Sequence, residues 1–379
     1  MKANRLIDLM HWLDGQGIAA DDPRRHKAYG LFLDRKAREF GVPVTGIFEL
    51  TPLCNFDCGM CYVHLTKGQM EGRKVLRAPE WIALIDAGVE RGMMSAQLTG
   101  GEALLHPDFD EIYLHLRKRG VMVTVMSNGW LLTKERVAFF EKYPPASIQV
   151  TLYGGNEDDY EKVTGKRAFG CVTENILRAR KVDCRLLVSA TPSKYFGLEA
   201  LKRVKAFALE NGLKLKVNNA LNEPREETGR ALEDFALSEE EIVDIKLYLA
   251  GKDRECLREL SDAPPTGRNQ KPSHGLRCGA GRDLFCINWK GQMKACLDLE
   301  EYQEPLAVGF DAAWERLHDF AVHYEVPREC VGCKYVQVCN PCPVLHAMNA
   351  PKGHADPVMC ARTRKLARCG CLRLPEGEG

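Results

Sequence analysis

From Thr45 onward, short β-prone runs alternate with longer segments that have the periodicity of an amphipathic helix. Such alternation predicts a parallel sheet whose strands are joined by right-handed helical crossovers. Six units of this kind fit an α/β fold with a partial (β/α)6 barrel of the TIM type, or a full barrel, with chemistry on loops at the carboxyl ends of the strands. The six runs are residues 45–51, 95–99, 121–126, 147–152, 185–190 and 213–218.

Glycine marks the expected ends of three intervening helices. The amphipathic stretches 80–91, 107–119 and 196–211 are each followed directly by glycine, the residue that helix C-termini prefer. This agreement between periodicity and capping supports the helical assignment of the connections.

Two regions flank the expected barrel. The N-terminal extension contains two short helices, at 6–13 and 26–40, which are too brief for an independent domain. After the barrel comes a charged and polar linker with a helix at 238–250, and then a small cysteine-rich domain with a hairpin at 285–296 around Lys290-Gly291. The expected divisions are residues 1–44 (extension), 45–230 (barrel), 231–275 (linker), 276–371 (cysteine-rich domain) and 372–379 (tail).

Cysteine is frequent in this chain, with 16 among 379 residues. Residues 1–20 lack the apolar core of a signal peptide, and no apolar window of ~18 residues occurs, so we expect a cytoplasmic protein without membrane association. Because disulfides are rare in a reducing cytosol, metal binding is the better explanation of the cysteines. The net charge of +1 provides no global attraction to nucleic acid.

Cys54, Cys58 and Cys61 lie on the loop directly after the first run, in the sequence CNFDCGMCY. A closed structural zinc site needs four ligands and a disulfide needs two, so three thiols match neither. A 4Fe–4S cubane held by three cysteines leaves one iron open to another ligand. A zinc knuckle or a redox-inert loop is the alternative interpretation.

Glycine and polar residues follow the second and third runs. Gly100 and Gly101 of TGGE would let the backbone approach a ligand closely, and Glu102 could accept hydrogen bonds from a cationic amine. Ser127 and Asn128 of SNG suit a sugar hydroxyl or a carboxylate. Taken alone, each motif is equally typical of an ordinary turn.

Together these features resemble the radical S-adenosylmethionine (radical SAM) family over residues 45–220, whose CxxxCxxC and GGE motifs match CNFDCGMC and TGGE. The resemblance implies a 4Fe–4S cluster on the first three cysteines, with the amine and carboxylate of S-adenosylmethionine (SAM) chelating the open iron. An electron from the cluster then cleaves SAM to methionine and a 5′-deoxyadenosyl radical, which abstracts hydrogen from the substrate. The residues implied in SAM binding are Tyr62 near the adenine, Gly100, Gly101 and Glu102 at the amine, and Ser127, Asn128 and Thr151 at the ribose and carboxylate.

The cysteines after residue 276 have a spacing that resembles the SPASM domain. Cys278, Gly291 and Cys296 match the opening of its pattern, and the later group departs from it only in having two residues, not three, before Cys342. A zinc ribbon is the alternative. The resemblance implies two auxiliary 4Fe–4S clusters, and so three clusters in all. One auxiliary cluster would bind to Cys330, Cys333, Cys339 and Cys360. The other would bind to Cys278, Cys296 and Cys342, and its fourth iron would either bind Cys286 or stay open. Of the remaining cysteines, Cys369 and Cys371 are expected to be free thiols, and Cys171, Cys184 and Cys256 are expected to be ordinary buried thiols.

Radical SAM proteins with such a domain mostly modify peptides or proteins, and some act on sugars. The segment 151–165 (TLYG…YEKVTG) resembles maturases that crosslink or oxidise residues of ribosomally made peptides (RiPP maturases). Anaerobic sulfatase-maturating enzymes are one alternative, but they place an aspartate where this chain has Leu297, with Asp298 one residue later. A dehydrogenase or epimerase of a sugar or aminocyclitol is the second alternative.

The resemblance also implies partners: a peptide or protein substrate and a cytosolic electron donor of the flavodoxin or ferredoxin type. The ~44 residues before the first run are too few for the winged-helix domain that often binds a leader peptide, so leader recognition would need a separate leader-peptide-binding protein or another surface. Glu49 and Arg230 are candidates to meet substrate, although structural ion pairs explain them more simply. The sequence does not identify the catalytic acid or base.

Overall fold

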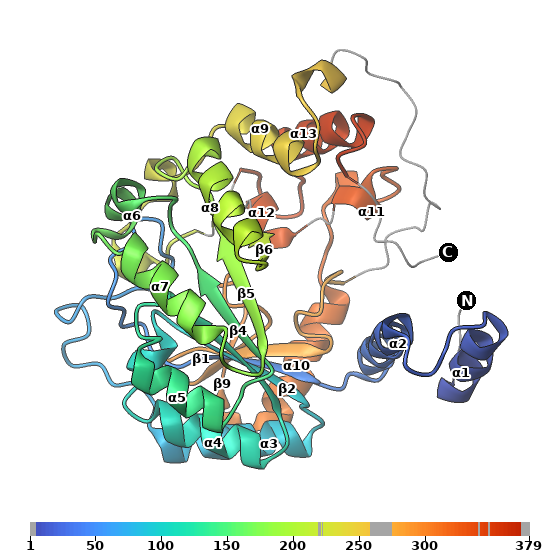
Figure 1. Cartoon of the computed structure of the whole chain (residues 1–379). Coiled ribbons are helices and arrows are strands. Elements are labelled where there is room, and N and C mark those ends of the chain that lie inside the picture. Colours follow the sequence, from blue (N-terminus) through green and yellow to red (C-terminus); the bar gives the residue numbers. More distant parts are fainter. Residues whose placement is uncertain are drawn as a thin grey trace.

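The computed structural model describes residues 5–218, 221, 223–257, 275–339, 342–347 and 349–372, with the backbone alone for Gln337. Its strands form one sheet of nine, in the order β6-β5-β4-β3-β2-β1-β7-β8-β9. The first six are parallel and consecutive, which confirms the predicted α/β fold and partial barrel (Figure 1). The strands are β1 (Thr45–Glu49), β2 (Ser95–Thr99), β3 (Met122–Ser127), β4 (Ser147–Thr151), β5 (Arg185–Ala190), β6 (Lys214–Val217), β7 (Leu284–Ile287), β8 (Gln292–Lys294) and β9 (Gln303–Pro305).

Helices connect the parallel strands, as the periodicity predicted. The stretches 80–91, 107–119 and 196–211 correspond to α3, α4 and α8, and the glycine that follows each has a positive φ. The helix predicted at 238–250 is α9. The helices are α1 (Leu6–Gly15), α2 (Pro23–Phe40), α3 (Ala78–Glu90), α4 (Phe109–Lys118), α5 (Lys134–Lys142), α6 (Glu157–Thr164), α7 (Phe169–Ala179), α8 (Leu198–Glu210), α9 (Glu239–Leu249), α10 (Phe310–His323), α11 (Val336–Cys339), α12 (Pro343–Ala347) and α13 (Pro357–Arg368).

The N-terminal extension forms the two expected helices. They pack on each other through Leu9 and Leu13, and they lie beside the main body (Figure 1). The Arg38 Nε atom donates to Asp283 Oδ2 at 2.9 Å, which ties α2 to the segment before β7. In the part of the chain that the structure describes, no helix is both long and apolar enough to cross a membrane.

The predicted hairpin at 285–296 is confirmed as the antiparallel pair β7–β8. The sequence did not predict that β7 also pairs in parallel with β1, with Thr45 opposite Leu284 and Phe48 opposite Ile287. The cysteine-rich tail therefore continues the sheet of the barrel across the boundary expected near residue 276. Residues 258–274 of the expected linker lie outside the described residues, as does 373–379.

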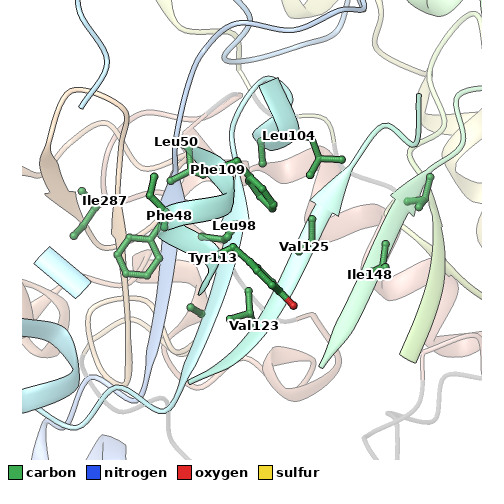
Figure 2. Close-up of a cluster of buried hydrophobic side chains, with 14 of the residues drawn as sticks. Phe48, Leu50, Leu98, Leu104, Phe109, Tyr113, Val123, Val125, Ile148 and Ile287 are labelled. Atoms are coloured by element: carbon green, nitrogen blue, oxygen red, sulfur yellow. The ribbon is translucent and has the colours of Figure 1, made fainter. Parts of the chain in front are cut away.

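Alternate residues of the strands build the main hydrophobic core. Figure 2 shows Leu98, Val123 and Val125 near Tyr113 of α4, with Phe48 of β1 in the same cluster. Their neighbours along the strands point to the other face, which is only partly buried in β2 and β4. The sheet thus has a packed face under the helices and a more open inner face.

Phe285 of β7 is the aromatic residue that joins the tail to the barrel core. Its ring contacts Phe48 edge-on at 5.9 Å between centroids, and contacts Phe310 of α10 at 5.2 Å. We expect Phe285→Ala to lower the free energy of unfolding by about 3–5 kcal/mol, because it leaves a cavity between three elements. Urea unfolding under anaerobic conditions measures the change.

Phe40→Ala is the matched control, since Phe40 ends α2 with 70% of its surface exposed. Its free energy of unfolding should stay within about 0.5 kcal/mol of the unchanged protein. Equal losses in the two variants would contradict the importance given to the β1–β7 contact.

Candidate functional site

The loop after β1 carries the cysteine triad at the carboxyl end of the sheet. Cys58 is buried, and Cys54 and Cys61 are half-buried. The loop is tied to the end of α6, because Asp57 N donates to Thr164 O at 3.0 Å and Gly59 N donates to Val163 O at 3.2 Å. These backbone contacts hold the loop at the carboxyl end of the sheet, where (β/α) barrels carry their functional residues.

Nitrogen–hydrogen donors point at two of the triad sulfurs. Cys54 Sγ accepts from Phe56 N at 3.4 Å and from Asn128 Nδ2 at 3.5 Å, and Cys61 Sγ accepts from His64 N at 3.3 Å. Hydrogen bonds of this kind favour a thiolate and tune the potential of an iron–sulfur cluster. The predicted residue Asn128 therefore reaches the triad directly.

The electrostatics of the triad suit a cationic ligand. Burial raises the pKa of Cys54 to about 12, and the neighbouring Cys61 raises it further. Burial and the other two thiols likewise raise the pKa of Cys58 well above its ordinary value. Three thiolates this close are stable only if positive charge compensates them, as iron does, so the donor set fits the expected cluster.

Within the described ranges, no three His, Cys, Asp or Glu side chains are arranged as ligands of one metal ion. A mononuclear site needs ligands that converge on a single point. A cubane is held differently, because each cysteine ligates a separate iron.

Gly100 and Gly101 let the loop after β2 lie against the loop that leads to the triad. Gly101 N donates to Thr51 O at 2.7 Å, and Glu102 N donates to Leu53 O at 2.9 Å. A Cβ on Gly101 would lie 2.4 Å from Leu53 O, and Gly100 has φ 149°. The two glycines are thus required for contact between two backbone segments, whatever else binds there.

The Glu102 carboxylate is fully buried and connects the loops after β2 and β3. It accepts from Leu104 N at 3.1 Å, from Asn128 N at 2.8 Å and from Ser127 Oγ at 3.1 Å. Burial raises the pKa of Glu102 to about 7, against the effect of these donors. Three predicted residues, Glu102, Ser127 and Asn128, are therefore in direct contact, and their role toward SAM stays a prediction.

Thr151 and Tyr62 lie at other positions around the same end of the sheet. Thr151 Oγ1 is 2.9 Å from Ser189 Oγ at the end of β5. The Tyr62 ring lies 5.5 Å from the Arg225 guanidinium carbon, and burial raises the pKa of Tyr62 well above its ordinary value. Neither contact tests the predicted proximity to SAM.

Glu49 and Arg225 form a buried ion pair that sequence reasoning did not identify as a pair. Arg225 Nη1 and Nη2 donate to the two Glu49 carboxylate oxygens at 2.8 and 2.9 Å, and Nη2 also reaches Leu297 O at 3.3 Å. Arg230 pairs with Asp57. The prediction that Glu49 and Arg230 form structural ion pairs is confirmed.

Tyr153 is a site residue that the sequence reasoning missed. Burial raises its pKa well above the ordinary value, and so do the neighbouring thiols of Cys58, Cys54 and Cys61. Its ring also packs edge-on against Phe56 at 6.2 Å. Its position two residues after β4 was the available signal, because the residues that follow parallel strands lie at one edge of the sheet.

The four tail cysteines assigned to one auxiliary cluster lie together. Burial raises the pKa of Cys330 to about 11, with contributions from Cys339, Cys360 and Cys333. Cys339 Sγ also accepts a hydrogen bond from Thr363 Oγ1 at 3.5 Å. The residues come from the segment around 328–339 and from α13, which approach each other only in the folded tail.

The second group lies near Asp298. Burial raises the pKa of Cys296 to about 12, and Asp298, Cys342 and Cys278 are among the neighbouring charges. Cys286 of β7 is buried beside Cys296, with its Sγ 3.9 Å from Ala295 O. The structure thus brings the predicted residues of this group together, and the identity of the fourth ligand stays open.

Comparison with known proteins agrees with this geometry. Residues 48–192 match the model of the Radical SAM superfamily. The chain is 27% identical over 157 residues to the antilisterial bacteriocin subtilosin biosynthesis protein AlbA of Bacillus subtilis, covering 40% of this chain and 34% of AlbA. It is 32% identical over 139 residues to a probable GTP 3',8-cyclase of Sulfolobus acidocaldarius, covering 36% of this chain and 43% of that protein. The chain thus spans less than half the length of these curated relatives.

Two solved structures share the fold over most of the chain. SuiB of Streptococcus suis, bound to the precursor peptide SuiA, superposes with a TM-score of 0.64 at 16% identity and covers 90% of this chain and 82% of SuiB. Native anSMEcpe, with bound AdoMet and the Cp18Cys peptide, gives a TM-score of 0.64 at 14% identity and covers 86% of this chain and 97% of anSMEcpe. The likeness extends beyond the barrel into the cysteine-rich tail.

Substitution of Gly101 tests whether the contact between the two loops positions the triad. We expect Gly101→Ala to lose most of its reconstituted iron, because the new Cβ would collide with Leu53 O and displace the loop that carries Cys54. Iron per chain and far-ultraviolet circular dichroism are the measurements.

Gly30→Ala is the control, since Gly30 lies within α2 with open space around it. It should keep its iron and gain up to about 1 kcal/mol of stability from the higher helix propensity of alanine. Full iron content in Gly101→Ala would refute the positioning role.

Proposed function

We propose that this chain, which carries a radical SAM domain and a SPASM-type tail, is a maturase that oxidises or crosslinks residues of a ribosomally made peptide. The observation that carries the proposal is the cysteine triad, two of whose sulfurs accept hydrogen bonds, beside the loop of Gly100, Gly101 and Glu102. The match of residues 48–192 to the radical SAM model supports the same chemistry.

The triad would hold a 4Fe–4S cluster whose open iron binds SAM. When bound, the cluster and SAM supply a 5′-deoxyadenosyl radical that takes a hydrogen atom from the substrate. The protein's own part is to orient the cofactor and to stabilise the cysteine thiolates. Asn128 and two backbone N–H groups donate hydrogen bonds to these sulfurs. The positive charge of Arg230 lowers the pKa of Cys58 and Cys61, against the effect of burial. Glu102 would accept a hydrogen bond from the SAM amine once its carboxylate is ionised.

A peptide substrate has the best support. SuiB binds a precursor peptide and anSMEcpe binds a peptide on the same fold, and AlbA is named for bacteriocin biosynthesis. Formylglycine formation, the sulfatase-maturase alternative, is less favoured because Leu297 stands at the expected aspartate and offers only its carbonyl, to Arg225 and Lys294. Sugar chemistry has no comparable support.

Asp298 is the carboxylate we propose as proton acceptor. Its Oδ1 is buried and has no hydrogen-bond partner among the described residues, and its Oδ2 is 3.6 Å from Cys296 Sγ. A buried carboxylate oxygen without a hydrogen-bond donor lowers the stability of the protein unless a bound ligand donates to it. Its place at the junction of barrel and tail is where a peptide held by both would lie.

The two tail groups would hold auxiliary clusters, one on the Cys330 group and one on the Cys296 group. We expect about twelve irons per chain after anaerobic reconstitution, corresponding to three 4Fe–4S clusters.

Cys54→Ala should abolish formation of 5′-deoxyadenosine, since it removes a ligand of the SAM-binding cluster. Cys333→Ala should lose about four irons and still cleave SAM, without modifying peptide.

Cys171→Ala controls for these variants. The sequence predicted a buried thiol at this position, which is wrong, because Cys171 is exposed on α7 and lies outside the three groups. It should retain its iron and its activity. Tightly bound zinc in place of iron would overturn the assignment of all three groups.

Mass spectrometry of candidate substrates tests the substrate class together with Asp298. A peptide should lose two hydrogens when incubated with the protein, SAM and a reductant. One would leave as a hydrogen atom and the other as a proton to Asp298, and an auxiliary cluster, when bound, would accept the remaining electron. With Asp298→Asn, peptide modification should fall by about 100-fold or more while cleavage of SAM continues, because proton transfer contributes this much. Asp319→Asn, on the exposed side of α10, is the control. Turnover of a free sugar, with no change in any peptide, would reject the maturase proposal.

A further inference from the structure

Three cysteines outside the expected cluster groups meet where the linker reaches the last helix. Cys256 lies in a single helical turn, η4 (Arg254–Leu257), which follows α9. Cys369 directly follows α13 as its C-cap residue, and Cys371 comes two residues later. Cys256 and Cys369 are 113 positions apart in the sequence, so only the fold brings them together.

The contacts among these three residues, here called the thiol trio, are direct. Cys369 Sγ lies 3.1 Å from Cys256 O, and Cys371 Sγ lies 3.9 Å from Cys369 O. Burial raises the pKa of Cys369 and of Cys371, and the neighbouring Cys256 raises both further. Cys256 is therefore the common neighbour of the other two.

The turn at the end of α13 positions Cys369 and Cys371. Cys371 N donates to Leu366 O at 3.0 Å, across Gly370 with φ 66°, so the chain folds back onto the helix. Leu366 packs with Val243 and Leu247 of α9 in a small separate core, against which Cys256 and Cys371 lie. The thiol trio thus belongs to the contact that attaches α13 to α9.

The neighbours of the thiol trio differ from those of the auxiliary groups. The thiol neighbours of Cys369 are Cys256 and Cys371, whereas Cys330 has Cys333, Cys339 and Cys360 around it. The trio is therefore a separate cluster of sulfur groups. It lies at the opposite end of α13 from Cys360, which belongs to the auxiliary group.

We propose that the thiol trio is a thiol–disulfide exchange site, in which Cys256 forms a disulfide with Cys369 and Cys371 can replace Cys369 by exchange. The oxidant is a low-molecular-weight disulfide such as oxidised glutathione. Attack by one cysteine sulfur forms a mixed disulfide and releases one glutathione thiol; the second cysteine displaces the other. The protein loses two electrons and two protons, and the oxidised glutathione becomes two thiols.

The surroundings of the thiol trio slow its reaction with outside reagents and favour reaction among its own thiols. Burial raises the pKa of Cys369 to about 12, and its hydrogen bond with Cys256 raises it further, so the thiols stay protonated and react slowly with outside reagents. Their mutual contact favours reaction with one another once a mixed disulfide has formed. The product would covalently join the linker to α13, the helix that carries Cys360, and this inference does not depend on the substrate proposed above.

Mass spectrometry after redox equilibration tests the proposal. The full chain, reconstituted anaerobically, is equilibrated with mixtures of reduced and oxidised glutathione, alkylated and digested with trypsin. Cys256 then lies in the peptide ECLR (255–258), and the other two cysteines lie in CGCLR (369–373). We expect these peptides to be linked, with one alkylated cysteine in CGCLR, and the linked fraction to grow with the share of oxidised glutathione.

Variants make the test specific. Cys256→Ser should lose the linked species completely, Cys369→Ser should keep it through Cys371, and Cys184→Ser, altered at a half-buried thiol outside the trio, should leave it unchanged. An internal Cys369–Cys371 disulfide with alkylated Cys256, or alkylation of all three in oxidised glutathione, would overturn the proposal. Zinc bound by the unchanged protein and lost in Cys256→Ser would overturn it as well, in favour of a metal site.

Discussion

The close contact between the loops after β1 and β2 is the constraint on which the rest of the site depends. Two backbone hydrogen bonds, Gly101 N to Thr51 O and Glu102 N to Leu53 O, hold these loops at a separation that no side chain on Gly101 allows. The triad follows Leu53 directly, so its position is set by this contact. Glu102 then extends the contact to the loop after β3 through Asn128, whose amide returns to Cys54.

A second connection joins the barrel to the tail. β7 extends the sheet beside β1, and the Glu49–Arg225 pair is buried at the end of β1, with Arg225 also reaching Leu297 O. A buried ion pair contributes little net stability, but separating it is costly, since it leaves a charge uncompensated. The pair holds Arg225 in place, and the bond from Arg225 to Leu297 O then connects the barrel to the tail beside Asp298.

The sixteen cysteines fall into environments that spacing alone does not distinguish. Within the triad and within each of the two tail groups the thiols lie near one another, so each group is electrostatically incomplete without a cation. The thiol trio has the same crowding of sulfur groups, but it lies at a packing contact between two helices. We therefore expect thiol–disulfide exchange at the thiol trio, because the fold holds these three cysteines together at the end of α13.

The sequence by itself determined the features that depend on neighbours within a few residues. Hydrophobic periodicity and glycine caps located the six parallel strands and their helices, and cysteine spacing after the first strand indicated the triad. Tertiary structure decided what depends on residues far apart: the pairing of β7 with β1, the choice of Arg225 as partner of Glu49, the approach of Tyr153 to the triad, and the meeting of Cys256 with Cys369. The physical reason is that local patterns report which face of an element is buried, whereas the partner at a given position is selected by packing over the whole chain.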